Sequence, residues 1–208
     1  SGSAGTLNGT TDADRFVVAG SQSVTANGTT FNQVTSVIAG DGDDDVQSEL
    51  ANWDIQAANT TTLDGIDFSG IESVNKYISA GVTGRSIAGT NLQDAFSIIG
   101  ENTIKVNGIT YYGIGIVNAG NNTDTVTGLT GQAWTIYRDG KTFEGFSGSG
   151  VIFKEIEVAD SLSSGSLTGT DLSERFATTG SLNQVIFGFG NVTFKGITRV
   201  DAKKGNEW

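Results

Sequence analysis

Four aspartates between residues 41 and 45 form the most acidic stretch of the chain and the first candidate for chemistry. Asp41, Asp43, Asp44 and Asp45 stand in the segment AGDGDDDV, which interleaves them with glycine and ends on valine. This order matches all but the first glycine of G-G-x-G-x-D-x-U-x, a calcium-binding nonapeptide. Calcium prefers carboxylate and carbonyl oxygens as ligands. These four aspartates are therefore our candidate metal ligands, and calcium is the only cofactor that we consider.

The motif stands alone, which leaves a second interpretation open. A calcium-binding β-roll needs consecutive nonapeptides, because each ion lies between successive turns. The residues that follow do not repeat the motif, and the related segment AGNNTDTV (119–126) keeps only Asp124 of the acidic residues. The alternative is an exposed turn in which the aspartates accept hydrogen bonds from local backbone amides.

Two further kinds of acidic residue recur along the chain. Asp14 and Asp94 each stand two positions before an aromatic residue, and Glu72 and Glu157 each follow an isoleucine. Facing outward, the two aspartates would line a surface that binds sugars or cations. We expect the aspartates to cap turns instead, and the glutamates to stand on a solvated face.

The sequence gives little support to catalysis, and we expect no enzyme activity and no catalytic residues. The chain has no histidine and no cysteine, which removes the commonest general base and the thiolate nucleophile. Besides the aspartate cluster, only YRDGKTFEGF (137–146) departs clearly from the rest. We predict a type I′ or related turn at Asp139-Gly140. A phosphate-binding loop is excluded because Thr135 stands where the loop needs glycine.

Composition narrows the class of partner and of fold. The formal net charge of the 208 residues is -11, so phosphate backbones and anionic membranes are repelled and nucleic acid is not an expected partner. No apolar run is long enough to span a bilayer, so we expect no direct membrane insertion. Glycine (30 residues), threonine, asparagine and serine alternate with valine, isoleucine and phenylalanine. This composition predicts short strands joined by tight turns.

Internal repeats organise the chain. LNGTTDADRF (7–16) recurs as IAGTNLQDAF (87–96) and as LTGTDLSERF (167–176), so the three copies begin at equal intervals. A second pattern, an aromatic residue followed three positions later by isoleucine or valine, recurs at about half this interval. Its five pairs are Phe31/Val34, Phe68/Ile71, Tyr111/Ile114, Phe153/Ile156 and Phe194/Ile197. Because strands alternate with period two, we interpret the spacing of three as a corner between two strands.

Aromatic residues are the remaining candidates for ligand contact. Trp53 and Trp134 could stack on sugars, but they occupy positions like that of Phe16 in the repeat, and we expect them in the core. Four tyrosines are weaker candidates for sugar contact, and the sequence does not rank them. They are Tyr77, Tyr111, Tyr112 and Tyr137.

Together these patterns predict an all-β fold, a parallel β-helix (a solenoid) built from units of about 40 residues paired into 80-residue repeats. A single segment would span residues 1–208, with repeats starting near 7, 87 and 167 and about ten coils of roughly 20 residues. The alternative is a tandem array of β-sandwich domains meeting near residue 85. Trp208 falls where another unit would begin, so we expect a fragment of a longer repetitive protein.

The motifs resemble the repeats of large secreted bacterial adhesins. The resemblance rests on L-x-G-T-x-x-x-D-x-F, FSGIESV (68–74), AGDGDDDV (39–46) and GLTGQAWTI (128–136). These look like the repeats of exoproteins of the filamentous haemagglutinin type, including CdrA-like biofilm matrix adhesins. The resemblance implies a right-handed parallel β-helix, two-partner secretion to the cell surface, and a role in cell–cell or biofilm attachment. Expected partners are exopolysaccharide or neighbouring adhesin molecules, and the alternative is a carbohydrate-binding or polysaccharide-cleaving β-helix domain.

Overall fold

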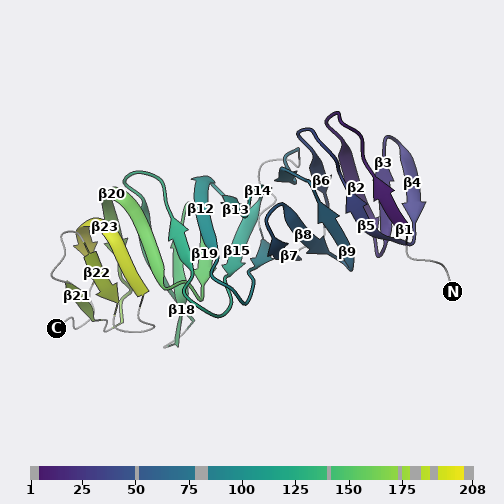
Figure 1. Ribbon diagram of the computed structural model, residues 1–208. Helices are drawn as coiled ribbons and strands as arrows, with labels where there is room; N and C mark the ends of the chain where they lie inside the picture. Colours follow the sequence, from purple (N-terminus) through teal and green to yellow (C-terminus); the bar gives the residue numbers. More distant parts are fainter. Residues whose placement is uncertain are drawn as a thin grey trace.

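The computed structural model describes residues 5–49, 52–77, 84–139, 142–172, 175–178, 184–187 and 192–203. These residues form strands and turns, with no helix among them. The strands stack into an elongated solenoid (Figure 1). The all-β solenoid predicted from the sequence is therefore confirmed.

The strands line two sides of the core, which we call face A and face B. Face A consists, in spatial order, of β4 (Thr29–Asn32), β3 (Ser23–Ala26), β2 (Arg15–Gly20), β6 (Asp45–Gln47), β10 (Ser73–Val74), β14 (Ile109–Tyr112), β13 (Thr103–Val106), β12 (Ala95–Gly100), β16 (Thr125–Thr127), the first parts of β20 (Val158–Thr168) and β23 (Val192–Asp201), β22 (Gln184–Phe187) and β21 (Phe176–Thr178). Face B consists of β1 (Gly5–Asn8), β5 (Val34–Ile38), β9 (Ile66–Ser69), β8 (Thr60–Leu63), β7 (Asn52–Ala57), β11 (Arg85–Ala88), β15 (Ile114–Asn118), β19 (Val151–Lys154), β18 (Thr142–Gly148), β17 (Ala133–Asp139) and the second parts of β20 and β23.

Three-stranded antiparallel meanders alternate between the two faces. The meanders β2–β3–β4, β12–β13–β14 and β21–β22–β23 lie on face A, and β7–β8–β9 and β17–β18–β19 lie on face B. Strands that join one meander to the next pair in parallel. Because successive meanders change face, the chain returns to the same environment only after two units, which together make one full repeat. This alternation is the structural origin of the two periods in the sequence.

Corners with positive φ explain the aromatic-x-x-aliphatic pattern. In all five copies the residue before the isoleucine or valine is left-handed, with φ between 59° and 73°. These residues are Gln33, Gly70, Gly113, Glu155 and Gly196. The left-handed residue turns the chain from the third strand of a meander toward the opposite face. After the corner, the alternation of side chains that face the core starts anew. The predicted corner is thus confirmed.

The hairpins within the meanders use the turn chemistry that the sequence indicates. In four meanders, both residues of the two-residue turn in the second hairpin have positive φ, as type I′ turns require. These turns are Asn27-Gly28, Asp64-Gly65, Asn107-Gly108 and Ser149-Gly150. Asp139 pairs with Thr142 across β17 and β18, and the turn predicted at Asp139-Gly140 lies partly outside the described residues.

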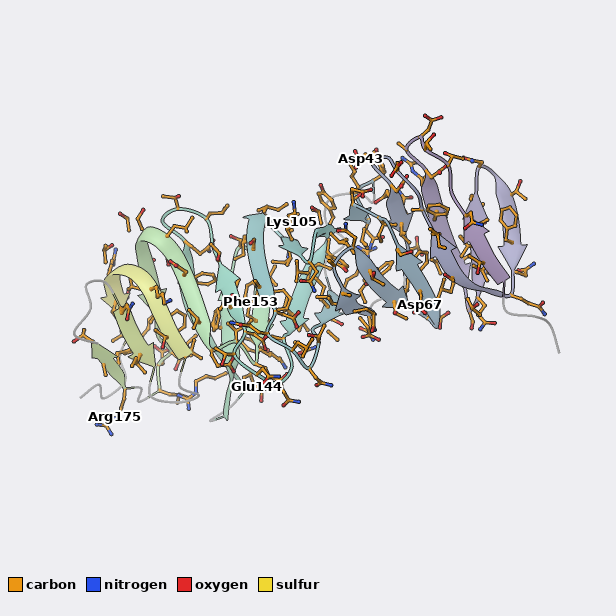
Figure 2. The ribbon with its side chains drawn as sticks, viewed as in Figure 1. Asp43, Asp67, Lys105, Glu144, Phe153 and Arg175 are labelled. Atoms are coloured by element: carbon orange, nitrogen blue, oxygen red, sulfur yellow. The ribbon has the colours of Figure 1, made fainter. Side chains whose placement is uncertain are left out.

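A continuous apolar core runs between the two faces. Trp53, from face B, lies 6.4 Å from Tyr111 of face A, measured between ring centroids. Phe146 of face B lies 5.1 Å from Phe194 of face A. Side chains such as Phe153 point between the strands, whereas Asp43 and Lys105 lie at the periphery (Figure 2). Trp53 and Trp134 are fully buried, which confirms the prediction that they belong to the core.

Two details of the sequence interpretation change. β11 pairs in parallel with β7 on one side and with β15 on the other, so the sheet continues through residue 85 and no pair of sandwich domains meets there. The solenoid makes about five turns, so the expected stack of about ten shorter coils is wrong. The reason is that the hairpins fold back on one face instead of passing round the axis.

Candidate functional site

The described turns that lead from face B to face A lie along one edge of the solenoid, and each of them supplies a carboxylate. We call these residues the carboxylate edge. In chain order they are Asp14, Asp44, Glu72, Asp94, Asp124 and Glu157. Glu174, at the matching position of the third repeat, lies outside the described residues. The edge is a regular polar feature of the described residues, and it includes Asp44 of the aspartate cluster found in the sequence.

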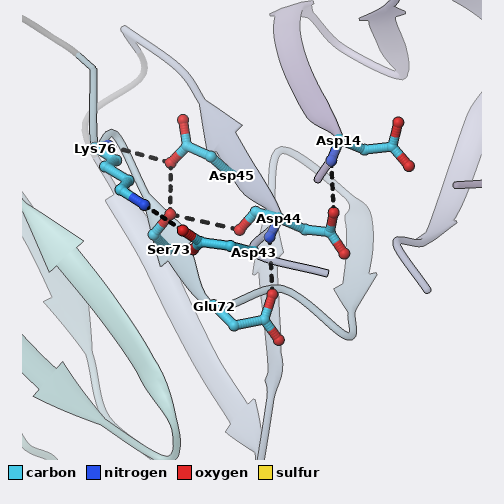
Figure 3. A network of polar contacts seen from close by, with 7 residues as sticks. All are labelled: Asp14, Asp43, Asp44, Asp45, Glu72, Ser73 and Lys76. Atoms are coloured by element: carbon cyan, nitrogen blue, oxygen red, sulfur yellow. Dashed lines mark hydrogen bonds and ion pairs between the residues drawn. The ribbon is translucent and has the colours of Figure 1, made fainter. Parts of the chain in front are cut away.

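The first three members are linked through the backbone (Figure 3). The Asp14 carboxylate caps its own turn, because its Oδ2 accepts hydrogen bonds from the Thr10 N–H at 2.6 Å and from the Thr10 hydroxyl at 2.9 Å. The Asp14 N–H donates to Asp44 Oδ1 at 2.7 Å, and the Asp44 N–H donates to Glu72 Oε2 at 2.9 Å. Each carboxylate of a later coil therefore binds the main chain of the coil before it.

The same arrangement recurs in the next full repeat. The Thr90 N–H donates to Asp94 Oδ2 at 2.6 Å, the Asp94 N–H to Asp124 Oδ1 at 2.7 Å, and the Asp124 N–H to Glu157 Oε2 at 2.7 Å. The predicted turn-capping role of Asp14 and Asp94 is confirmed. The expectation for Glu72 and Glu157 is wrong, because both are half-buried and hold the peptide N–H of a neighbouring coil.

The four aspartates proposed as calcium ligands have separate partners. Asp44 is fully buried on the carboxylate edge, and Asp45 is buried with its Oδ1 accepting from the Ser73 hydroxyl and from the Lys76 N–H. Asp43 is exposed and forms an ion pair with Lys76 at 2.5 Å, while Asp41 is exposed. Within the described ranges, no group of three or more acidic residues is placed to hold a metal ion.

The alternative interpretation of the cluster also needs correction. An exposed turn with local hydrogen bonds was expected, but Asp44 and Asp45 are buried and bind amides of the neighbouring coils, far away in sequence. The side chains of this turn therefore form hydrogen bonds to neighbouring coils and not to the turn's own backbone. Calcium binding by the cluster stays a prediction.

Glycine is required where these turns stack, because their backbones touch. A Cβ on Gly89 would lie 2.1 Å from the carbonyl oxygen of Ala119 and 2.9 Å from Asp94 Oδ2. Gly40 has a φ of 103°, and a Cβ there would lie 2.1 Å from the carbonyl oxygen of Thr10. No side chain fits between the coils at these points, so the carboxylates reach the peptide groups directly.

Asp44 and Asp124, the middle residues of the two hydrogen-bonded sets of three, both have a raised carboxyl pKa. Burial raises the pKa of the Asp124 carboxyl to about 6, against the effect of the hydrogen bond from the Asp94 N–H, and nearby carboxylates raise it further. Burial likewise raises the pKa of Asp44, with Glu72 among the acidic neighbours that add to the effect. In both residues Oδ1 accepts the inter-coil hydrogen bond, while Oδ2 is buried without a hydrogen-bond partner.

The structure also places the aromatic candidates. Trp134 donates its indole N–H to the Ser161 hydroxyl at 2.7 Å within the core, and Tyr111 is fully buried, so neither is available to a sugar. Tyr77 is 58% exposed, and the guanidinium carbon of Arg15 lies 4.0 Å from its ring centroid. Tyr137 is also exposed.

Residues 144–146 line a cleft that the sequence did not predict. The pairing of β17 with β18 shifts register between Tyr137 and Arg138, opposite Gly145 with a φ of 141°. Beside this irregularity lies an open cleft of about 430 Å³, whose polar lining includes Glu144, Lys154 and Glu157. Glu144 and Lys154 form an ion pair at 3.3 Å. The sequence signal for this cleft was that residues 137–146 depart from the repeat.

Comparison with known proteins adds no relative, since no protein-family model, no curated protein and no solved structure matches the chain. In the described part of the chain, no helix is long and apolar enough to cross a membrane.

Inserting a side chain where two backbones approach closely is expected to destabilise the solenoid. In Gly89→Ala the new methyl group meets a backbone oxygen that cannot move without separating two coils, so we expect a loss of about 3 kcal/mol in the free energy of unfolding. Urea denaturation followed by circular dichroism measures this loss. Gly100→Ala is the matched control, because its Cβ would have only ordinary contacts at 3.7 Å. Equal losses in the two variants would contradict the backbone contact.

Stability is also expected to depend on pH through Asp124. Its folded pKa lies above the unfolded value of 3.8, so the folded state binds the proton more tightly and this residue's contribution rises as the pH falls through 6 toward 4. Asp124→Asn keeps an oxygen for the Asp94 N–H and removes the buried charge. We expect it to raise the free energy of unfolding near neutral pH by about 1–2 kcal/mol.

Urea denaturation at about pH 5 and about pH 7.5 tests this expectation. The difference between the two pH values should change in Asp124→Asn and stay as in the wild type in Asp12→Asn, whose side chain is exposed. An unchanged pH dependence in Asp124→Asn would show that this carboxyl does not titrate in the range.

The calcium prediction has its own test. If Asp41, Asp43, Asp44 and Asp45 bind calcium, the melting temperature rises when calcium is added and falls when a chelator removes it, since a ligand of the folded state stabilises that state. Isothermal calorimetry should then give a heat of binding that Asp44→Asn removes. A calorimetric signal that survives in Asp44→Asn would contradict the site.

Proposed function

We propose that this chain is a structural and adhesive segment of an exported bacterial adhesin, in which it serves as a stiff spacer at the cell surface. The observation that carries the proposal is the way in which consecutive coils are joined. Main-chain pairing links neighbouring strands along both faces, and the carboxylate edge adds charged hydrogen bonds to the backbone between the coils of Asp14, Asp44 and Glu72 and again between those of Asp94, Asp124 and Glu157.

These contacts favour stiffness along the axis. Bending the solenoid at the carboxylate edge would separate groups such as the Asp94 N–H and Asp124 Oδ1, which are 2.7 Å apart and buried. An ionised acceptor makes a hydrogen bond stronger than a neutral one does, and a buried amide without a partner costs free energy. Resistance to bending is what a spacer between a cell and its surroundings needs.

The lateral surface supplies the adhesive part of the proposal. Outward positions on the strands carry short polar side chains, for example Thr25 and Thr30, whose hydroxyl oxygens are 2.9 Å apart across β3 and β4. Such side chains offer both donors and acceptors to the hydroxyl groups of a polysaccharide. Exopolysaccharide or a neighbouring adhesin molecule is the partner that we propose for this surface.

The cleft beside β18 favours a second candidate, a carbohydrate-binding or polysaccharide-cleaving domain. Its volume of about 430 Å³ lies within the range of small-ligand sites. Glu144 and Lys154, which form an ion pair and line the cleft, would contact a bound sugar. A glycan array probed with the wild type and with Glu144→Gln separates this candidate from the spacer, because only a cleft-bound glycan loses its signal in the variant.

Mechanical unfolding tests the spacer proposal. When single molecules are pulled from their two ends, we expect stepwise unfolding in which a unit of about 40 residues releases about 140 Å of chain. The steps should occur at lower force in Glu157→Ala, which leaves the Asp124 N–H without its acceptor.

Glu101→Ala is the control, because its side chain is exposed and lies outside the carboxylate edge. Smooth extension at low force without discrete steps would contradict a stiff spacer. Turnover of a polysaccharide by the wild type would favour the second candidate.

A further inference from the structure

Cationic side chains gather on the outer surface of face A, although the chain as a whole is acidic. Arg15 of β2 and Lys105 of β13 are both exposed there, and they lie in one row across the sheet. Strand pairing sets Arg15 opposite Asp45, Asp45 opposite Ser73, Ser73 opposite Thr110 and Thr110 opposite Lys105. Four strand spacings separate the ends of this row, so Arg15 and Lys105 lie about 19 Å apart.

Lys76 adds a third cation between these two. Asn75, just after β10, has a left-handed φ of 63°, and beyond it the chain crosses the outer surface of β6 toward β2. The Lys76 N–H donates to Asp45 Oδ1 at 3.1 Å, and the Lys76 ammonium forms an ion pair with the exposed Asp43 (Figure 3). Asp45 is buried beneath this segment. The outer surface therefore presents the cations and covers the carboxylate that lies between them.

Tyr77 holds the guanidinium of Arg15 in place. The ring centroid of Tyr77 lies 4.0 Å from the guanidinium carbon of Arg15 and 5.7 Å from Lys76 Nζ, within the range of cation–π contacts. Among the described residues no carboxylate pairs with Arg15, and Asp45 Oδ2 has no hydrogen-bond partner. The N–H groups of Arg15 are thus available to a planar anion from outside the chain.

The fold does not need these side chains, because the next full repeat lacks them. Ala95 stands at the position of Arg15, and Ser161-Leu162 stands at that of Lys76-Tyr77, counted from the corner isoleucines that the units share. In that repeat β12, β16 and β20 still pair in parallel, as β2, β6 and β10 do. A departure from the repeat that strand pairing does not require is expected to serve recognition.

We propose that the cationic row, which consists of Arg15, Lys76 and Lys105 together with Tyr77, binds a carboxylated polysaccharide. The guanidinium of Arg15 offers parallel N–H donors to a carboxylate, and the exposed part of the Tyr77 ring offers an apolar surface to a sugar ring. The length of about 19 Å suits a polymer and exceeds a single sugar. The inference rests on the adhesive part of the proposed function and names the class of polysaccharide.

The charge of the chain selects among anionic polymers. The formal net charge is -11, so the surface away from the cationic row repels a polyanion. A densely sulfated polymer brings more negative charge than three cations offset, whereas a polymer with one carboxylate per sugar meets less repulsion. Because the contact is electrostatic and exposed, binding should weaken as the salt concentration rises.

Biolayer interferometry on immobilised polymers tests the proposal. The wild type is compared on polygalacturonate, which is carboxylated, on dextran sulfate and on uncharged dextran. A chelator is present throughout, so that calcium does not bridge carboxylates of the protein and the polymer. We expect the tightest binding on polygalacturonate, weaker binding on dextran sulfate and none on dextran.

Variants locate the binding surface. Arg15→Ala and Tyr77→Ala should each raise the Kd for polygalacturonate about tenfold, as the loss of a hydrogen bond to a charged group predicts. Arg15→Lys keeps the charge without the planar pair of donors and should recover only part of the affinity.

Arg199→Ala and Tyr137→Ala are the matched controls, because they remove an exposed arginine and an exposed tyrosine from face B. Both should bind polygalacturonate as the wild type does. Circular dichroism melting verifies that each variant folds.

The outcomes separate this inference from the adhesive function. Equal losses in Arg15→Ala and Arg199→Ala would overturn the cationic row, since net charge alone would then govern binding. Tighter binding to dextran sulfate than to polygalacturonate would overturn the choice of a carboxylated partner. Binding to uncharged glycans alone would overturn the inference and leave the adhesive function standing, whereas binding to no glycan would contradict both.

Discussion

The hydrogen bond from a peptide N–H to the carboxylate of the following coil is the interaction on which this solenoid depends. Turns at the carboxylate edge are stacked so closely that the Cβ of any residue other than glycine would strike the next backbone at positions such as Gly89. The amides in these turns are thereby cut off from water and need an acceptor inside the protein. Asp44 and Asp124 supply it, at the cost of burying a charge. The edge therefore fixes both the spacing of the coils and the side on which they are held together.

Alternating meanders provide the second constraint, which is a core without gaps. A meander places three strands on one face, so the opposite face must be covered by strands from neighbouring coils. Large aromatic residues fill the space that results, as where Trp53 of a face B meander meets Tyr111 of a face A meander. Because the meanders alternate between face A and face B, the two faces have matching lengths along the axis. Meanders confined to one face would lengthen that face and leave the other uncovered.

Much of this architecture could be predicted from the sequence, because local rules determine it. The corners follow from a three-residue spacing that no single strand allows, and the type I′ turns follow from pairs such as Asn107-Gly108. The folding back of the hairpins was nevertheless not predicted, because an apolar strand has the same period in a coil and in a meander, although the Asn-Gly pairs are a hairpin signal. The burial of Asp44 was missed for another reason: its partner, the Asp14 N–H, belongs to the preceding coil, and nothing in the acidic cluster points to it. Glu72 was expected on a solvated face for the same reason, since its hydrogen-bond partner, the Asp44 N–H, belongs to a neighbouring coil.

The meanders also determine the order in which the fold can assemble. Strands β12, β13 and β14 follow one another directly in sequence, joined only by tight turns, so a meander forms from local contacts with little loop-closure entropy to overcome. Joining that meander to the coil before it requires only the adjacent segment, which is already in place. A chain that becomes available from one end can consequently grow its solenoid unit by unit, each new coil using the last as a template, with no need to wait for distant residues.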